Sequence, residues 1–176
     1  MNSVFADLTT SQGAIPLGTA RRDAPDGPGL YSIFVVSPEA LPAPYSDELV
    51  VRSTRLLYVG KASRSLKRRL LEEDLLGKRN STFFHAVGAI LGYRPPRGSL
   101  RGKSNQNNYR FSPNDRRKIV EWINRHVRVR WRESERVDLE PRLIMKLQPI
   151  LNTQYNPRPS QHLARLRREC REIARA

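Results

Sequence analysis

The chain has 176 residues, of which 32 are Lys or Arg and 17 are Asp or Glu, so its formal net charge at pH 7 is +15. The length suits one domain with a modest core and leaves little room for a second, and the charge favours nucleic acid over an anionic membrane surface as partner. The sequence contains no apolar run that could span a bilayer, and its single cysteine, Cys170, excludes an internal disulfide and a cysteine-rich zinc site. We therefore expect a cytoplasmic protein without a membrane segment.

The first third of the chain predicts an arm followed by a small sheet. Residues 1–28 are rich in glycine and proline and lack periodicity, so we expect a loosely ordered arm. Residues 30–36 and 55–60 are apolar and β-branched enough to form two strands. The segment between them shows no helical pattern, which favours an antiparallel pair joined by an enlarged loop.

Helices are predicted in the middle of the chain. Leucines recur at helical spacing over residues 65–76, and a second helix begins after Ser81. Residues 97–110 form a polar loop, and Ser112-Pro113 starts a third helix.

The last third predicts one more strand and two helices. Residues 127–131 alternate apolar and arginine side chains, as a half-exposed strand does. A helix capped by Asp138 carries Glu140 in its first turn, and a basic helix ends the chain.

Together these elements predict a mixed α/β (α+β) fold, with a three-stranded antiparallel sheet flanked by helices and an extra C-terminal helix. The expected division is an arm over residues 1–28, a domain over 29–157 and a basic helix over 158–176.

Two short motifs lie on the predicted strands, Gly29-Leu30-Tyr31 and Tyr58-Val59-Gly60. Further polar residues follow them in a fixed order: Lys61, Arg69, Glu140 and Asn152. In this order and combination the residues resemble the GIY-YIG nuclease family, with Leu30 and Val59 in place of the isoleucine of each motif. The resemblance covers residues 29–157.

The resemblance implies hydrolysis of phosphodiester bonds. Tyr31 would be the general base after losing its proton, and Lys61 and Arg69 would favour the phenolate, since a free tyrosine has a pKa of about 10. Tyr58 would position the attacking water, and the planar fork of Arg69 would bind a phosphate oxygen.

The remaining implied roles concern a metal and its surroundings. Glu140 would hold one divalent cation, Mg²⁺ or Mn²⁺, which keeps several waters and needs few protein carboxylates. Asn152 would support the site by hydrogen bonding. A family position after the arginine holds His or Tyr; Glu73 and Asp74 lie nearest to it here, and His85, further along, is the candidate to fill it.

Basic, amide and aromatic residues are candidates for contacts with nucleic acid, expected to be double-stranded DNA. Amides and arginines read base edges, and tyrosine stacks on bases. The candidates lie after the second motif and in the polar loop: Arg64, Lys67, Arg68, Arg101, Lys103, Asn107, Tyr109 and Arg110. A solvated, flexible loop over 97–110 is an equally open interpretation.

Each of these residues also has an ordinary structural interpretation. Strand tyrosines commonly pack in cores, and a glutamate in a first helical turn commonly just favours the helix dipole. Four functions therefore stay open: a metal-dependent DNA endonuclease, a dimeric restriction-type version of it, a binding module without catalysis, and a basic adaptor. A monomer and a homodimer both fit. The complete set of two tyrosines, arginine and glutamate favours the endonuclease.

Overall fold

The computed structural model describes residues 2–176, and side chains from Ala6 onward. Its centre is an antiparallel sheet with strand order β1-β4-β2-β3. The strands have these bounds: β1 Ile15–Pro16, β2 Gly29–Val35, β3 Leu56–Ala62 and β4 Val127–Glu133. The mixed α/β class and the antiparallel sheet are confirmed, but the sheet has four strands rather than three.

The fourth strand comes from the segment that we expected to be a loosely ordered arm. This segment contains α1 (Asn2–Thr9), the two-residue β1 and α2 (Leu17–Asp23). Leu8 is fully buried, and its carbonyl oxygen accepts a hydrogen bond from Ser32 Oγ at 2.8 Å. The helices were not predicted because each is too short to show a clear apolar period between the surrounding glycines and prolines.

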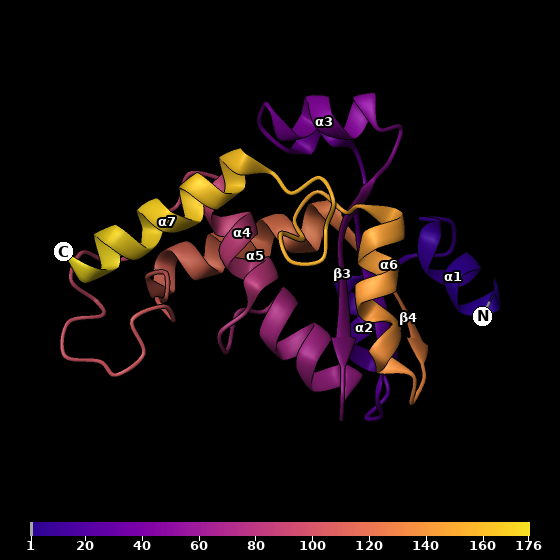
Figure 1. The fold of residues 1–176 in the computed structure, drawn as a ribbon. Helices are drawn as coiled ribbons and strands as arrows, with labels where there is room; N and C mark the ends of the chain where they lie inside the picture. Colours follow the sequence, from indigo (N-terminus) through magenta and orange to yellow (C-terminus); the bar gives the residue numbers. More distant parts are fainter. Residues whose placement is uncertain (1) are drawn as a thin grey trace.

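Helices cover both faces of the sheet (Figure 1). On one face α1 and α6 (Glu140–Leu147) enclose a small core that includes Leu30, Phe34 and Val59. The other face carries the larger core, which includes Tyr31 and Ile33. These helical elements lie on this second side: α2, η2 Lys67–Leu75, α4 Thr82–Ile90, α5 Pro113–His126 and α7 Gln161–Arg175.

The connection between β2 and β3 holds more structure than we expected. It contains the 3-10 turn η1 (Pro38–Ala40) and the short helix α3 (Tyr45–Val51), whose Tyr45 and Leu49 are buried one turn apart. The antiparallel pairing of β2 with β3 agrees with the prediction, and Tyr31 lies opposite Gly60 in this pair.

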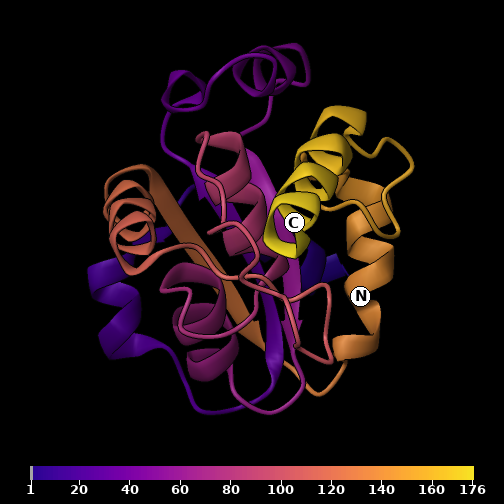
Figure 2. The same cartoon turned by 90° about the vertical axis from the view of Figure 1, so that its left-hand side faces the viewer.

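The end of the chain packs across α4, as Figure 2 shows from the side of α7. The loop 97–110 is bonded to the last turns of α7, since Leu100 N donates to Ala174 O at 2.7 Å and Gly98 N donates to Ile173 O at 3.1 Å. The 3-10 turn η3 (Val137–Leu139) leads into α6 on the other side of the sheet. Among the residues described here, no helix combines the length and the apolar character needed to cross a bilayer.

Candidate active site

The order of strand, basic helix and late glutamate along the chain places the candidate residues around one edge of the sheet. β3 is an outermost strand, so side chains from both faces can meet at its edge. Arg69 comes from η2 on one face, and Glu140 is the first residue of α6 on the other. Both side chains line a cleft of about 450 Å³ beside Lys61.

Glu140 is one of two carboxylates that line this cleft, the other being Glu73. Its Oε2 lies 3.0 Å from Lys61 Nζ, and the two side chains are 15% and 42% exposed. Glu140 also lines a second cleft of about 220 Å³ with Tyr58 and Asn152. One carboxylate is thus shared by two neighbouring clefts.

Tyr31 lies behind the first cleft and does not reach its surface. The side chain is fully buried, and its hydroxyl donates a hydrogen bond to Asp74 Oδ2 at 2.5 Å. Asp74 Oδ1 accepts two further bonds, from Arg69 Nη1 and from Ser81 Oγ, each at 2.5 Å. Asp74 therefore joins Tyr31 to Arg69 in one buried network.

The winding of η2 explains how Asp74 reaches Arg69. η2 is a π-helix, which bonds residue i to residue i+5, so positions five apart lie on the same side. In an α-helix of 3.6 residues per turn they would point in different directions. Glu73, four residues after Arg69, also approaches it, with Oε2 3.4 Å from Nη1.

Burial and the charge of Asp74 keep both tyrosines protonated. Burial first, and then the charge of Asp74, raises the pKa of Tyr31 well above its usual value, and the same two causes raise the pKa of Tyr58. Burial opposes the charge on Arg69, but the charge and hydrogen bond of Asp74, together with the two tyrosines, outweigh it, so the pKa of this guanidinium is raised. Arg69 is thus held as a cation beside two neutral phenols.

Tyr58 is the tyrosine that lines a cleft with Glu140. It is 6% exposed, its ring packs on Phe83 with 5.6 Å between centroids, and it is tilted against Tyr31 at 6.5 Å. Asn152 fixes the same strand, because its side chain accepts from Val59 N and donates to Val59 O, both at 2.9 Å. These bonds connect the segment after α6 to β3.

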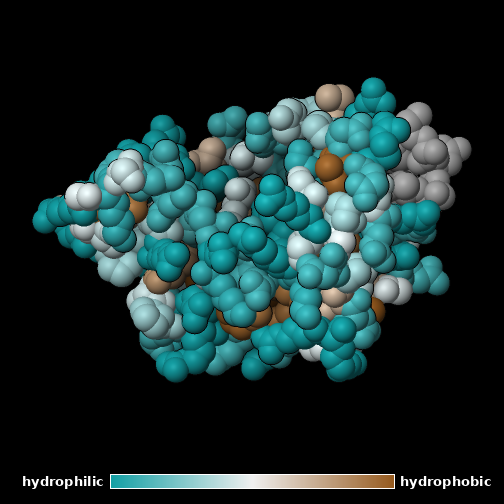
Figure 3. All heavy atoms as spheres, turned by 90° about the horizontal axis from the view of Figure 1, so that it is seen from below, coloured by the Kyte–Doolittle hydropathy of each residue, from teal (hydrophilic) through white to brown (hydrophobic). Residues whose placement is uncertain are grey.

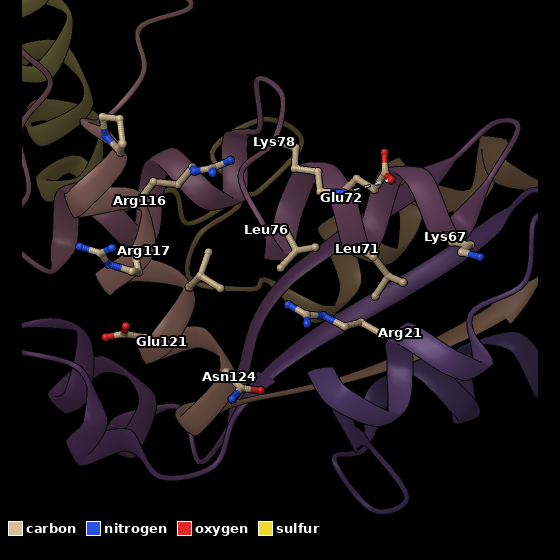
Figure 4. Close-up of a pocket in the computed structure, with 12 residues that line it drawn as sticks. Arg21, Lys67, Leu71, Glu72, Leu76, Lys78, Arg116, Arg117, Glu121 and Asn124 are labelled. Atoms are coloured by element: carbon tan, nitrogen blue, oxygen red, sulfur yellow. Dashed lines mark hydrogen bonds and ion pairs between the residues drawn. The ribbon is translucent and has the colours of Figure 1, made fainter.

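The basic residues of η2 and the turn before it lie on two sides of the helix. Arg64 and Arg68 are exposed and line the cleft of Arg69 and Glu140. Lys67 instead lines a separate groove of about 870 Å³ between α2, η2 and α5, where Leu71 and Leu76 form apolar walls (Figure 4). All three were predicted to contact nucleic acid, and the structure places Lys67 in a different groove from the other two.

His85 and Tyr109 lie away from this site. Residues 83–90 of α4 are all buried, His85 is 6% exposed and Tyr109 is 2% exposed, and their rings stack at 4.3 Å. Burial, followed by the charge of Arg167, lowers the pKa of His85 to about 4. His85 does not line either cleft of Glu140, and the Tyr109 ring has no free face on which a base could stack in this structure. Asp74, not His85, stands beside Tyr31.

Other residues of the polar loop are exposed and partly bonded to α7. Arg101 contacts the carbonyl oxygen of Ala176, and Asn107 Oδ1 accepts from Arg175 Nη2 at 3.1 Å. Lys103 and Arg110 are exposed, and Arg110 lines a pocket with His85 rather than with Glu140.

Two residues of the site were not predicted. The position of Asp74 depends on the π-helical turn, for which the sequence gives no clear signal. Arg167 lines the second cleft with Tyr58 and Glu140. A signal for it exists, because Arg167 interrupts the apolar stripe of α7 between Leu163 and Cys170.

The family model described as the GIY-YIG catalytic domain matches residues 29–172, and the chain belongs to this family. This confirms the resemblance seen in the two motifs and indicates a nuclease-type function on nucleic acid. No curated protein and no solved structure matches the chain.

Proposed function

We propose that the chain is a metal-dependent endonuclease that hydrolyses phosphodiester bonds in DNA. The observation that carries this proposal is the meeting of Arg69 and Glu140, from opposite faces of the sheet, in one cleft at the edge of β3. Hydrolysis needs an oriented water and relief of charge on the phosphoryl oxygens. A guanidinium and a metal-binding carboxylate in one cleft could together offset the charge on the phosphoryl oxygens.

Arg69 is the proposed phosphate ligand. Its planar guanidinium can donate to two phosphate oxygens, and it is 27% exposed by its side chain while Asp74 holds it from the buried side. Arg64 and Arg68, exposed on the same cleft, would bind neighbouring phosphates.

Glu140 fits a single divalent cation. Mg²⁺ commonly takes one or two carboxylates and keeps several waters, so the absence of any group of three or more His, Cys, Asp or Glu ligands among the described residues does not oppose it. A Mg²⁺ or Mn²⁺ ion bound there would polarise a water and offset charge on a phosphoryl oxygen. Lys61, now 3.0 Å from Glu140, would then be released toward the substrate.

The two tyrosines have different proposed roles. We expected Tyr31 to act as a phenolate base, but its buried hydroxyl donates to Asp74 and its pKa is raised, so we propose that it holds Asp74 and Arg69 in place. Tyr58 lines the second cleft of Glu140 and would orient the attacking water from that side as a neutral phenol.

Double-stranded DNA in the cytoplasm is the proposed substrate. The net charge of +15 supports a polyanion, and the space-filling view in Figure 3 shows a face covered mainly by hydrophilic residues. A catalytically inactive binding module of the same fold is the alternative.

Cleavage of supercoiled plasmid separates the two. The purified chain is incubated with plasmid in Mg²⁺, in Mn²⁺ and in EDTA. Nicking or linearisation only with metal is expected, whereas salt-sensitive binding without any cleavage would favour the binding module.

A further inference from the structure

The second cleft of Glu140 contains an arginine whose place in its helix is unusual. In α7 the residues Leu163, Cys170 and Ala174 are fully buried, and Arg167 lies between them on the same helical face. A basic residue on the buried stripe costs free energy unless its charge is compensated. Arg167 lines the cleft that Tyr58 and Glu140 also line.

Arg167 has no hydrogen-bond or ion-pair partner within the described part of the chain, although charged and ionisable neighbours affect its pKa. Three other partly buried arginines each have a carboxylate partner: Arg52 with Glu48, Arg69 with Asp74 and Arg94 with Glu169. Burial, together with the nearby Arg171, lowers the pKa of Arg167, as expected for a cation that lacks a counter-charge. An anion bound in this cleft would therefore supply the counter-charge that Arg167 lacks.

From this geometry we infer that Arg167 binds the phosphate next to the scissile one. The inference rests on the proposed nuclease function. Glu140 is common to both clefts, so a strand whose scissile phosphate lies at Arg69 and Glu140 would continue into the cleft of Arg167. Arg69 and Arg167 would then bind successive parts of one phosphate backbone, on either side of the metal-binding carboxylate.

The inference makes a stability prediction that a packing role does not. Arg167→Met keeps the aliphatic stem and removes an unpaired, half-buried charge, so its thermal midpoint should equal or exceed that of the original protein. Affinity for a labelled duplex oligonucleotide in EDTA should nevertheless fall by about ten- to a hundredfold, as the loss of a charged hydrogen bond predicts. Arg168→Met, exposed on the same helix, is the matched control and should change the affinity less.

A neutral phosphate analogue locates the contact. Methylphosphonate is placed, one position at a time, around the cut mapped with the original protein. Neutralising the adjacent phosphate should weaken DNA binding by the original protein and by Arg168→Met. It should leave binding by Arg167→Met unchanged, because this variant has already lost the contact. Arg167→Lys keeps the charge and should recover part of the affinity. Such recovery would show that the loss in Arg167→Met comes from the missing charge and not from misfolding.

The possible results separate this inference from the proposed function. Unchanged affinity of Arg167→Met, or a lowered thermal midpoint in both Arg167 variants, would overturn the inference, whatever the cleavage result. An equal methylphosphonate effect in Arg167→Met and the original protein would also overturn it. A protein that binds DNA through Arg167 but cuts nothing with any metal would refute the nuclease and retain the phosphate site.

Discussion

At the scale of single residues, the buried carboxylate of Asp74 determines what its neighbours can do. It accepts hydrogen bonds from Tyr31, Arg69 and Ser81, and Ser81 Oγ in turn accepts from Phe84 N to cap α4. A buried charge is tolerated only with such partners. The orientation of Arg69, the proposed phosphate ligand, therefore depends on a residue that takes no part in the cleft surface.

Replacing Asp74 tests this dependence. Asp74→Asn keeps the shape but removes the charge opposite Arg69, so the free energy of unfolding should fall by about 3 kcal/mol, as breaking a buried pair does. Urea denaturation measures the change. Glu72→Gln, which removes the exposed pair with Lys78, is the control and should cost less than about 1 kcal/mol. Equal midpoints for the two variants would contradict the buried network.

The tyrosines can be separated by removing one hydroxyl at a time. Tyr31→Phe leaves Asp74 with one donor fewer and should lower stability by about 1–3 kcal/mol. Tyr58→Phe removes a hydroxyl that has no hydrogen-bond partner among the described residues, so it should lower the cleavage rate while the thermal midpoint changes little. Loss of cleavage in Tyr31→Phe at unchanged stability would instead support Tyr31 as the base.

At the scale of elements, two helices have unusual features. The π-helical turn of η2 brings Asp74 to Arg69, and α4 buries His85 among apolar residues. Burial lowers the pKa of His85 from 6.5 to about 4, so the folded protein holds this imidazole neutral. Between these pH values the unfolded chain binds more protons than the folded one.

Stability should therefore depend on pH through His85. Its contribution is complete above about pH 6.5 and is lost as the pH falls toward about 4, a loss on the order of 3 kcal/mol. Thermal midpoints measured from pH 7 to pH 4 test this. His85→Phe preserves the ring stack on Tyr109 and should flatten the dependence of the thermal midpoint on pH over this range. An unchanged dependence would show that other groups cause the loss of stability in acid.

The elements also show what could be predicted from the sequence. Strands β2, β3 and β4 and the helical stretches from η2 to α7 follow from apolar periodicity and capping residues such as Ser81 and Ser112. Helices α1, α2 and α3 are only seven or eight residues long, and their burial depends on distant contacts. The motif residues were found in order, but the burial of Tyr31 and His85 depends on tertiary packing that no local pattern reports.

At the scale of the whole molecule, the charge of +15 predicts binding that weakens steeply with salt. Arg64 and Arg68 line the cleft, whereas Arg101 and Lys103 lie on the loop beside the end of α7. A role of the loop in binding DNA stays a prediction. The division of the chain into an arm over residues 1–28, a domain over 29–157 and a basic helix over 158–176 also stays a prediction.

Paired glutamine variants separate the two surfaces. Arg64→Gln/Arg68→Gln should reduce the salt slope of binding by about two, at about 0.9 per phosphate, and also slow cleavage at saturating DNA. Arg101→Gln/Lys103→Gln should reduce the slope without slowing cleavage at saturation. Affinity titrations at several salt concentrations, with single-turnover rates, measure both; a loop variant with an unchanged slope would place the loop off the DNA.

The most direct test of the account is the single-turnover cleavage rate of plasmid DNA in Mg²⁺ for the original protein and for Glu140→Gln, at protein concentrations that saturate the DNA. Saturation removes differences in affinity, and Glu135→Gln, an exposed glutamate nearby in sequence, is the matched control. We predict cleavage by the original protein and by Glu135→Gln, and a loss of at least about a hundredfold in Glu140→Gln, since a metal ligand is removed. Equal rates for all three proteins would show that Glu140 does not hold the catalytic metal and would contradict the proposed site.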